Sequence, residues 1–210
     1  MTDKIILVGG GGHCRACIDV IESANAEIAG IIDKDRSAEK IFKYSIIGSD
    51  DDIGTFSNKN YSFLVTIGQL KNPALRIEVF EKIKKSGGQF ATVISSTALL
   101  SKYSRIGEGT IVMHEVIINA SSQIGTNCII NTRALIEHDC MIGDHTHIST
   151  AAVVNGGCKI GNRTFIGSNS TIVQGVQIGD DVVVGAGSVV LRDLLEKGTF
   201  AGIPAKKISS

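Results

Sequence analysis

The sequence predicts a chain in two parts, a small parallel α/β unit over residues 1–95 and a parallel β-solenoid over residues 96–210. From Leu100 to Val190 an aliphatic residue recurs at every sixth position. This period fits neither an amphipathic helix nor an alternating strand and is typical of hexapeptide solenoids. The first 95 residues instead alternate short apolar runs with amphipathic stretches, which indicates parallel strands joined by helical crossovers.

Two other positions of the six-residue repeat support the solenoid. The fourth residue after each aliphatic is small or β-branched, as expected for a narrow interior, and it includes Cys128, Cys140 and Cys158. We therefore expect these cysteines to be reduced and packed inside. The residue directly after the aliphatic is often Gly or Asn, which predicts a positive φ at each corner. Glu137 breaks this rule beside His138.

In the first part, the pattern predicts two helices and four strands. The helices cover His13–Ser23, with Cys14 and Cys17 packed inward, and Pro73–Ser86, with Leu75, Val79, Phe80 and Ile83 inward. The strands cover Lys4–Val8, Ile28–Ile32, Phe63–Ile67 and Phe90–Ile94. A lone CxxC inside a helix, without a second pair, does not indicate a zinc site.

Composition points to a small-molecule partner. The formal net charge is zero, and the sequence contains no run of basic residues that would indicate nucleic acid or a membrane surface. No apolar stretch approaches the roughly 20 residues of a membrane span, and the first residues lack the apolar core of a signal peptide. We therefore expect a cytoplasmic protein.

Gly9 to Gly12 form a glycine loop between the first strand and the first helix. Ligands of parallel α/β units bind at the carboxyl ends of strands, and bare backbone amides at a helix start favour phosphate. A tight turn without a ligand is the alternative. The dinucleotide fingerprint is incomplete, because Cys14 or Arg15 stands where its third glycine falls, so NAD is not expected. Asp33, at the end of the second strand, either accepts hydrogen bonds from a ribose or base or is a solvated turn residue.

Four motifs together carry a family resemblance. They are G-G-G-G-H at 9–13, I-I-D-K at 31–34, T-I-G at 66–68 with Arg76 downstream, and I-N-T-R-A-L-I-E-H-D at 130–139. The whole chain resembles the sugar O-acyltransferases, hexapeptide-repeat enzymes that include N-acetyltransferases of UDP-linked 4-amino sugars and sialic acid O-acetyltransferases. The resemblance implies a Rossmann-like nucleotide-sugar-binding domain, a left-handed β-helix, acetyl-CoA as cosubstrate, no metal, and a homotrimer with active sites between neighbouring solenoids.

The resemblance also implies that His138 is the general base. An imidazole, with an ordinary pKa near 6.5, is well matched to removing a proton at neutral pH. Asp139 follows it where the family usually has Glu, and either Asp139 or Glu137 orients the ring. Gly156 lies 18 residues further on, one coil away if three repeats make a coil, where its amide would meet the thioester oxygen.

Further site residues follow from matching family positions. Asn131 and His147 are expected to line the acetyl-CoA pocket, although Asn131 also fits a purely conformational corner role and His147 also fits a surface position. His114 and His145 are expected on the surface. The nucleotide sugar is expected to bind Gly10, Gly11, Gly12, His13, Asp33, Lys34, Ile67 and Gly68.

The predicted function is acetyl transfer from acetyl-CoA to the 4-amino group of a UDP-linked sugar by direct attack. O-acetylation of a sialic-type sugar is the alternative within the family. A zinc site at His138, His145 and His147 is less favoured because these histidines lack the His-x4-His spacing of the zinc-dependent β-helix enzymes. A non-catalytic binding scaffold is a third alternative.

The ending Gly202–Lys206 resembles a family segment near the CoA nucleotide and also suits a cap on the solenoid.

Overall fold

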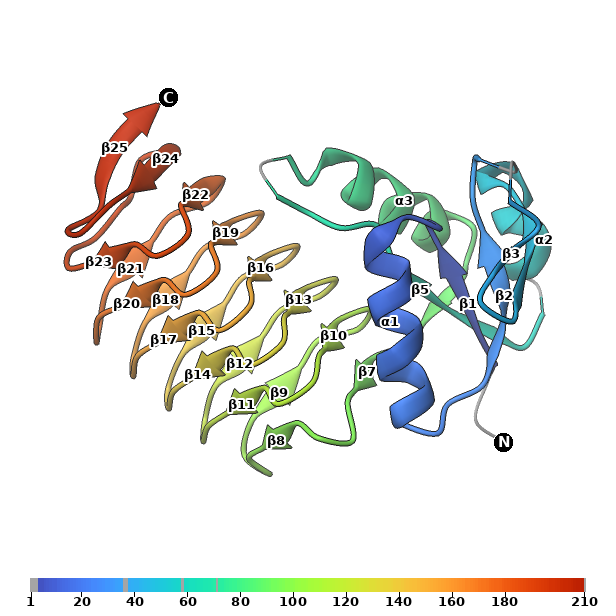
Figure 1. Cartoon of the computed structure of the whole chain (residues 1–210), viewed down its shortest axis with the longest axis horizontal. Helices are drawn as coiled ribbons and strands as arrows, with labels where there is room; N and C mark the ends of the chain where they lie inside the picture. Colours follow the sequence, from blue (N-terminus) through green and yellow to red (C-terminus); the bar gives the residue numbers. More distant parts are fainter. Residues whose placement is uncertain (1–3, 36–37, 58, 71, 210) are drawn as a thin grey trace. The chain divides into compact units, whose positions relative to one another are not determined.

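The computed structural model describes residues 4–35, 38–57, 59–70 and 72–209. The chain divides into two compact units, residues 1–96 and residues 97–210 (Figure 1). Within the described residues, each helix is too short or too polar to cross a membrane.

The first unit contains a six-stranded sheet with the order β3-β4-β2-β1-β5-β6. Its strands are β1 (Lys4–Val8), β2 (Ile28–Ile32), β3 (Lys40–Ile41), β4 (Tyr44–Gly48), β5 (Tyr61–Val65) and β6 (Gln89–Phe90). Its helical segments are α1 (Gly12–Ser23), η1 (Asp50–Asp52), α2 (Ile53–Ser57) and α3 (Ala74–Lys85). Neighbouring strands are parallel, as predicted, except in the β3–β4 hairpin.

The core of this unit confirms most of the predicted inward positions. A buried cluster joins strand, α2 and α3 residues: Ile6, Val8, Ile32, Ile53, Phe63, Val65, Val79, Phe80 and Ile83. The prediction for Leu75 was wrong, because it is 47% exposed while the neighbouring Arg76 is only 1% exposed. Arg76 Nη1 donates to the carbonyl oxygens of Val65 and Ile67, 2.6 and 2.9 Å away, which compensates the burial of a charged group.

Two parts of the first unit differ from the predicted elements. The β3–β4 hairpin was not predicted, because its strands are short and its turn, Phe42–Lys43, contains no glycine. β5 ends at Val65 rather than Ile67. The backbone amide of Thr66 still donates to the Val8 carbonyl, as in the sheet. The Thr66 hydroxyl donates to the Gly9 carbonyl, and the chain leaves the sheet at this residue.

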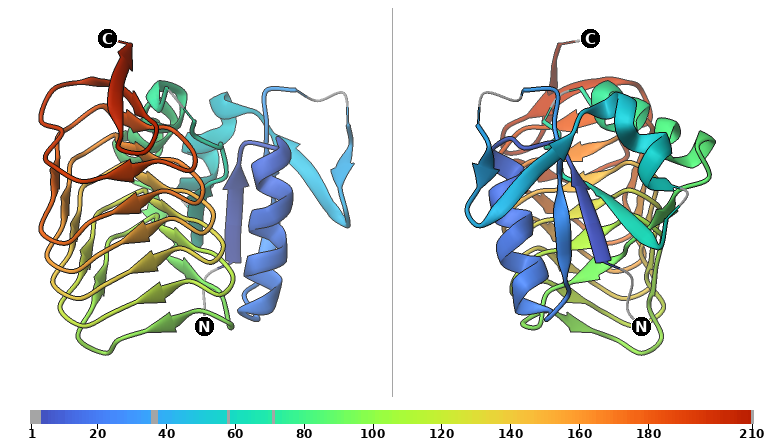
Figure 2. Two further views of the ribbon diagram at one scale, coloured as in Figure 1. Left: turned by 60° about the vertical axis from the view of Figure 1, so that its left-hand side comes forward. Right: turned by 90° about the vertical axis from the view of Figure 1, so that its right-hand side faces the viewer.

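The second unit is a prism of stacked coils with three flat faces (Figure 2). The β16 face begins with β7 (Val93–Ile94), so the predicted strand Phe90–Ile94 is divided between two sheets. It continues with β10 (Ile111–Val112), β13 (Ile129–Ile130), β16 (His147–Ile148), β19 (Phe165–Ile166), β22 (Val182–Val184), β24 (Gly198–Ala201) and β25 (Lys206–Ser209). The β14 face contains β8 (Leu99–Leu100), β11 (Ile117–Ile118), β14 (Leu135–Ile136), β17 (Val153–Val154), β20 (Thr171–Ile172) and β23 (Val189–Val190). The β15 face contains β9 (Arg105–Ile106), β12 (Gln123–Ile124), β15 (Met141–Ile142), β18 (Lys159–Ile160) and β21 (Gln177–Ile178).

Strand pairing confirms the predicted 18-residue coil. Ile118 pairs with Ile136, and Ile136 pairs with Val154, in unbroken parallel register. The aliphatic residues of the repeat are buried from Val112 onward, whereas Leu100 and Ile106 in the first coil are half-buried. Cys128, Cys140 and Cys158 lie fully buried among them as free thiols, as predicted.

The repeated glycines have a different cause from the one predicted. Gly107 and Gly161 do not adopt positive φ; a Cβ on either would lie 2.5 Å from the carbonyl carbon of a glycine in the next coil. Close approach of adjacent coils therefore requires glycine there. Positive φ occurs two positions later, as at Glu115, Arg133 and Asp139.

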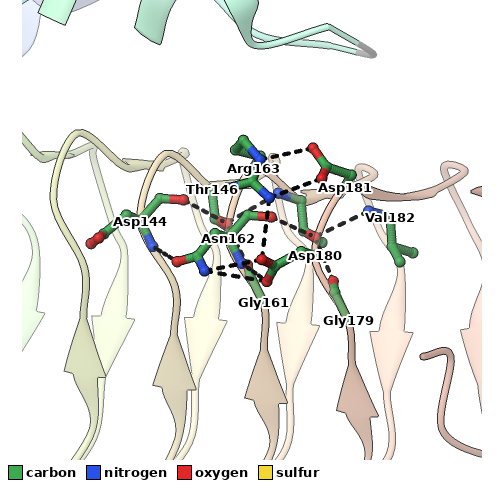
Figure 3. A network of polar contacts seen from close by, with 10 residues as sticks. Asp144, Thr146, Gly161, Asn162, Arg163, Gly179, Asp180, Asp181 and Val182 are labelled. Carbon is green, nitrogen blue, oxygen red and sulfur yellow. Dashed lines mark hydrogen bonds and ion pairs between the residues drawn. The ribbon is translucent and has the colours of Figure 1, made fainter. Parts of the chain in front are cut away.

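A polar ladder runs along the corner between the β15 and β16 faces (Figure 3). The backbone amide of Asp144 donates to Oδ1 of Asn162 over 2.8 Å. The backbone amide of Asn162 in turn donates to Oδ1 of Asp180 over 2.7 Å. Arg163 donates from Nη2 to Asp181, 2.9 Å away, and to Asp180, 3.2 Å away. The Asn162 amide lowers the pKa of Asp180, and the Arg163 hydrogen bond lowers the pKa of Asp181.

This ladder predicts a loss of stability in acid. A carboxyl pKa that is lower in the folded chain stabilises the fold above the unfolded pKa, and this contribution disappears as the pH falls through the folded value, between about pH 5 and pH 2. We expect the double substitution Asp180→Asn and Asp181→Asn to lower the thermal midpoint at pH 7 and to reduce its further fall in acid. Thermal unfolding across this pH range measures both effects. Substituting the exposed Glu108→Gln is the control, and an unchanged acid dependence in the double variant would contradict the assignment.

Candidate active site

His138 lies at the corner between the β14 and β15 faces. β14 ends at Ile136, and Asp139 adopts the left-handed region with φ of 59°. Because this turn ends the strand alternation, adjacent side chains converge, and His138 Nδ1 lies 2.8 Å from Asp139 Oδ2. Of the two carboxylates considered from the sequence, Asp139 is the one that contacts the ring.

The contact with Asp139 determines how His138 can react. A carboxylate only accepts hydrogen bonds, so neutral His138 donates from Nδ1 and keeps its lone pair on Nε2. The His138 side chain is 57% exposed, so a substrate can reach the ring. An imidazole with one nitrogen held by a carboxylate and a lone pair on the other has the arrangement of a general base.

Gly156 supports the ring from the next coil. A Cβ at Gly156 would lie 2.7 Å from both Cε1 and Nε2 of His138, so only glycine leaves space for the ring. The amide of Gly157 donates to the His138 carbonyl over 2.9 Å. The predicted stacking of His138 on Gly156 is confirmed. The Gly156 amide forms no hydrogen bond with the residues that the structure describes.

Glu137 points to the preceding coil instead of to the ring. Its carboxylate accepts a hydrogen bond from Asn119 Nδ2 over 3.0 Å, and its carbonyl accepts one from Ser122 Oγ over 2.6 Å. Glu137 therefore connects two coils at the base of the His138 turn.

Cys140, two residues after His138, is not available as a nucleophile. Burial raises the pKa of its thiol to about 11, and burial raises the pKa of Cys14 to the same value. Reactive cysteines are thiolates near neutral pH, so the structure favours direct attack by a substrate over a covalent cysteine intermediate.

His147 and Asn131 form a second polar group, at the opposite edge of the β14 face. Asn131 Nδ2 lies 3.2 Å from His147 Nε2, and the edge of the Phe165 ring packs against the imidazole with centroids 5.1 Å apart. His147 is only 5% exposed, so the surface interpretation was wrong. Asn131 does not adopt positive φ, so that part of the conformational role was wrong. Its Oδ1 accepts the Thr132 amide over 2.8 Å, so the side chain does help to fix the turn.

The remaining histidines do not join these groups. His145 contacts Asn127 on the corner between the β15 and β16 faces, and His114 contacts Thr97; both are half-buried rather than fully exposed. Among the described residues, no three His, Cys, Asp or Glu side chains are arranged to hold a metal ion. His138 and His145 lie on different corners of the solenoid and His147 lies in β16, so a single chain does not bring together the three histidines considered from the sequence.

In the first unit, the glycine loop is held from two sides. Thr66 Oγ1 donates to the Gly9 carbonyl over 2.6 Å, and the Gly10 amide donates to Asp33 Oδ2. Asp33 Oδ1 also accepts the Asp35 amide, so Asp33 is a structural clamp rather than a solvated turn residue. Because the Gly10 amide donates to Asp33, it is not available to a phosphate. Space remains open beside Gly11 and Gly12, where an added Cβ would meet no atom within 4 Å.

Three other predicted sugar-nucleotide residues, His13, Ile67 and Gly68, lie beside this loop. A Cβ on Gly68 would contact His13 at 3.4 Å, and a Cβ on Gly9 would strike Ile67. Lys34 Nζ lies 3.3 Å from Asp50. The carboxyl ends of β1, β2 and β5 thus bring Asp33, Ile67 and Gly68 to the glycine loop, whereas Lys34 pairs with Asp50. The sequence analysis did not predict the contact of Thr66 with Gly9 or the buried position of Arg76, whose guanidinium holds the chain at the end of β5. The available signal for Arg76 was a charged residue on the apolar face of a predicted helix.

The carboxyl-terminal segment closes the last coil. The Val189 amide donates to Gly202, and the Ala205 amide donates to Val189. Beside this cap lies a cavity of about 470 Å³, whose basic lining residues are Arg192, Lys206 and Lys207. The pocket is also lined by Asp193 and Glu196, and Lys207 forms an ion pair with Glu196 at 3.2 Å. The segment therefore caps the solenoid beside a pocket of mixed charge, with Arg192 and Lys206 as its other basic groups.

Comparisons with known proteins agree with this architecture. The PglD N-terminal domain model matches residues 4–83, and the bacterial transferase hexapeptide model matches residues 157–192. A comparison with curated proteins gave no match. The structure of perosamine N-acetyltransferase from Caulobacter crescentus, a mutant in complex with CoA and GDP-perosamine, is 33% identical, with a TM-score of 0.93 over 100% of this chain and 99% of that chain. The chain belongs to the hexapeptide-repeat acyltransferase family.

Other members of the family extend the comparison. The acetyltransferase domain of PglB from Neisseria gonorrhoeae, in complex with acetyl coenzyme A, is 27% identical, with a TM-score of 0.91 over 99% of this chain and 100% of that chain. WeeI from Acinetobacter baumannii, 23% identical with a TM-score of 0.88 over 98% and 99%, shares the fold. The acyltransferase therefore combines a Rossmann-like domain with a left-handed β-helix, and its relatives indicate a sugar N-acetyltransferase.

Proposed function

We propose that this acyltransferase moves the acetyl group of acetyl-CoA to the 4-amino group of a nucleotide-linked sugar, with His138 as the general base. The arrangement of His138 between Asp139 and Gly156 carries the proposal. Similarity to perosamine N-acetyltransferase, held with CoA and GDP-perosamine, supports the substrate class. The UDP form stays a sequence-based prediction, and GDP is the nucleotide of that relative.

In this reaction, the neutral sugar amine attacks the thioester carbonyl, forming an N–C bond. His138 Nε2 takes the proton from the attacking nitrogen, and Asp139 stabilises the imidazolium that results. The Gly156 amide donates to the oxygen that becomes negative. The C–S bond then breaks, and the CoA thiolate receives the proton from His138.

We infer a homotrimer because one chain separates the two groups that this reaction needs. His138 lies at one edge of the β14 face, and the Asn131–His147 pair lies at the other. The side chains on the face between them are in register at 18-residue spacing and are apolar except for Thr171: Leu99, Ile117, Leu135, Val153, Thr171 and Val189. Packing solenoids along this face buries the apolar residues. His138 of one chain then meets the Asn131–His147 pair of the next, with acetyl-CoA between them.

The proposed ligands fit the rest of the chain. The nucleotide sugar is assigned to the glycine loop with Gly11, Gly12 and His13, and the phosphates of CoA to the pocket of Arg192, Lys206 and Lys207. Free, buried cysteines suit a reducing compartment, and we assign the reaction to the cytoplasm.

A CoA-release assay tests the proposal. The purified protein is supplied with acetyl-CoA and, in turn, UDP-, GDP- and dTDP-linked 4-amino sugars and free sialic acid. We expect release with a nucleotide-linked amino sugar and, by light scattering, the mass of three chains. Release with sialic acid alone would overturn the assignment and favour O-acetylation.

A further inference from the structure

An exposed aromatic–guanidinium pair lies beside the glycine loop. The Arg15 Cζ atom is 5.6 Å from the centroid of the Phe42 ring. Phe42 is 63% exposed although Arg15 covers part of it, so much of the ring faces solvent. Arg15 lies one turn after Gly12 on α1 and is itself exposed. Within residues 4–35, 38–57, 59–70 and 72–209, no carboxylate forms an ion pair with Arg15.

The hairpin holds Phe42 firmly in this place. Tyr44 donates from its hydroxyl to Glu22 on α1 over 2.7 Å, and Lys43 forms an ion pair with the same carboxylate at 3.0 Å. Ile41 is buried, and its Cδ1 would lie 2.9 Å from a Cβ on Gly10. The turn that displays Phe42 is therefore anchored both to α1 and to the glycine loop.

Folding alone does not explain Phe42. Its φ is 53°, in the left-handed region that bulky residues rarely adopt. Burial of the ring does not offset the cost of this conformation, because the ring stays mostly exposed. The two-residue hairpin turn accounts for the positive φ, as solenoid turns do at Glu115 and Arg133. It does not require a phenyl ring, whose exposed face is open to a ligand.

We propose that Arg15 and Phe42 form one wall of the nucleotide site: the guanidinium binds the diphosphate, and the ring stacks on the base. Arg presents a planar fork that matches phosphate oxygens. Phenyl rings stack on any nucleobase, because every base has a π face. The pair therefore binds nucleoside diphosphates as a class and does not distinguish UDP from GDP. This inference rests on the proposed function, since it takes the nucleotide to be the ligand of this loop.

Calorimetric titration with GDP and with UDP tests the pair. We expect Phe42→Gly to weaken binding of the recognised nucleotide about tenfold to a hundredfold, while the thermal midpoint stays the same or rises because glycine tolerates positive φ. Phe42→Tyr keeps the ring and should retain binding. Arg15→Gln should weaken binding of the diphosphate more than binding of the corresponding nucleoside. In acetyl transfer, these weakening substitutions should raise the KM of the nucleotide sugar and leave the KM of acetyl-CoA unchanged.

The chain offers a matched control. Lys102 lies 4.9 Å from the Tyr103 ring, which is 66% exposed, so this is a similar surface pair in the solenoid. Tyr103→Gly should leave nucleotide binding unchanged. Wild-type affinity in both Phe42→Gly and Arg15→Gln would overturn the inference while leaving the proposed function intact. Failure of the wild-type protein to bind either nucleotide would instead contradict the proposed function and, with it, the inference.

Discussion

Replacing His138 by Asn is expected to lower kcat for acetyl transfer by about a hundredfold to ten-thousandfold, the range that a general base contributes. Asn removes the lone pair of Nε2 but keeps a polar side chain that can donate to Asp139. Substrate binding should change little, because the side chain is displayed at an open corner. Steady-state rates with both substrates, varied in turn, separate the loss of kcat from any change in KM.

Two comparisons make the His138 result specific. His145→Asn changes a histidine on another corner, which contacts Asn127 over 3.0 Å, and should keep wild-type activity. The pH profile of kcat should also differ between the wild type and His138→Asn, because the variant has no ionisable group at this position. A variant that retains most of the wild-type kcat would show that another group removes the proton.

Gly156→Ala is the second substitution expected to have a large effect. The added methyl would lie 2.7 Å from two ring atoms of His138, closer than nonbonded atoms can remain, so the imidazole must move. A displacement of about 1 Å at a catalytic group can cost about a hundredfold in rate. We therefore expect kcat to fall by about that factor, although the base itself is still present.

Gly54→Ala provides the control for Gly156→Ala. No atom lies within 4 Å of the position of a Cβ on Gly54, so the same change in side chain should leave activity intact. Thermal unfolding separates a displaced ring from a damaged fold: a small change in midpoint together with a large loss of kcat is expected. An unchanged kcat in a folded Gly156→Ala protein would contradict the assigned position of the imidazole.

The six-residue period predicted the solenoid well, because in a regular coil a sequence separation is also a spatial one. That relation placed the three solenoid cysteines inside and, together with the three-repeat coil implied by the family resemblance, placed Gly156 beside His138. The six-residue period did not show why glycine follows so many of the aliphatic residues. Close approach between coils and a positive φ both favour glycine, so the sequence could not separate these two causes. Only coordinates show that Gly107 faces a neighbouring backbone while positive φ falls at residues such as Glu115 and Asp139.

The site was predictable where it depended on repeats or motifs and less so where it depended on loops. Asp139 could not be chosen over Glu137 from the sequence, because the choice depends on the φ of a single residue at the turn. The β3–β4 hairpin gave no clear signal, since Phe42 occupies a turn position where glycine is usual. Burial of His147 was likewise invisible, because outward positions of the repeat accept polar and apolar residues alike.

The position of the transferred acetyl group tests the proposed chemistry most directly. The protein is incubated with acetyl-CoA labelled at the carbonyl carbon and with a nucleotide-linked 4-amino sugar, and the labelled bond in the product is identified by NMR. Direct attack by the amine, assisted by His138, predicts an amide at C4 that survives mild alkali, with equal amounts of free CoA and amide. A labelled ester that mild alkali removes, or release of CoA without an acetylated sugar, would contradict it.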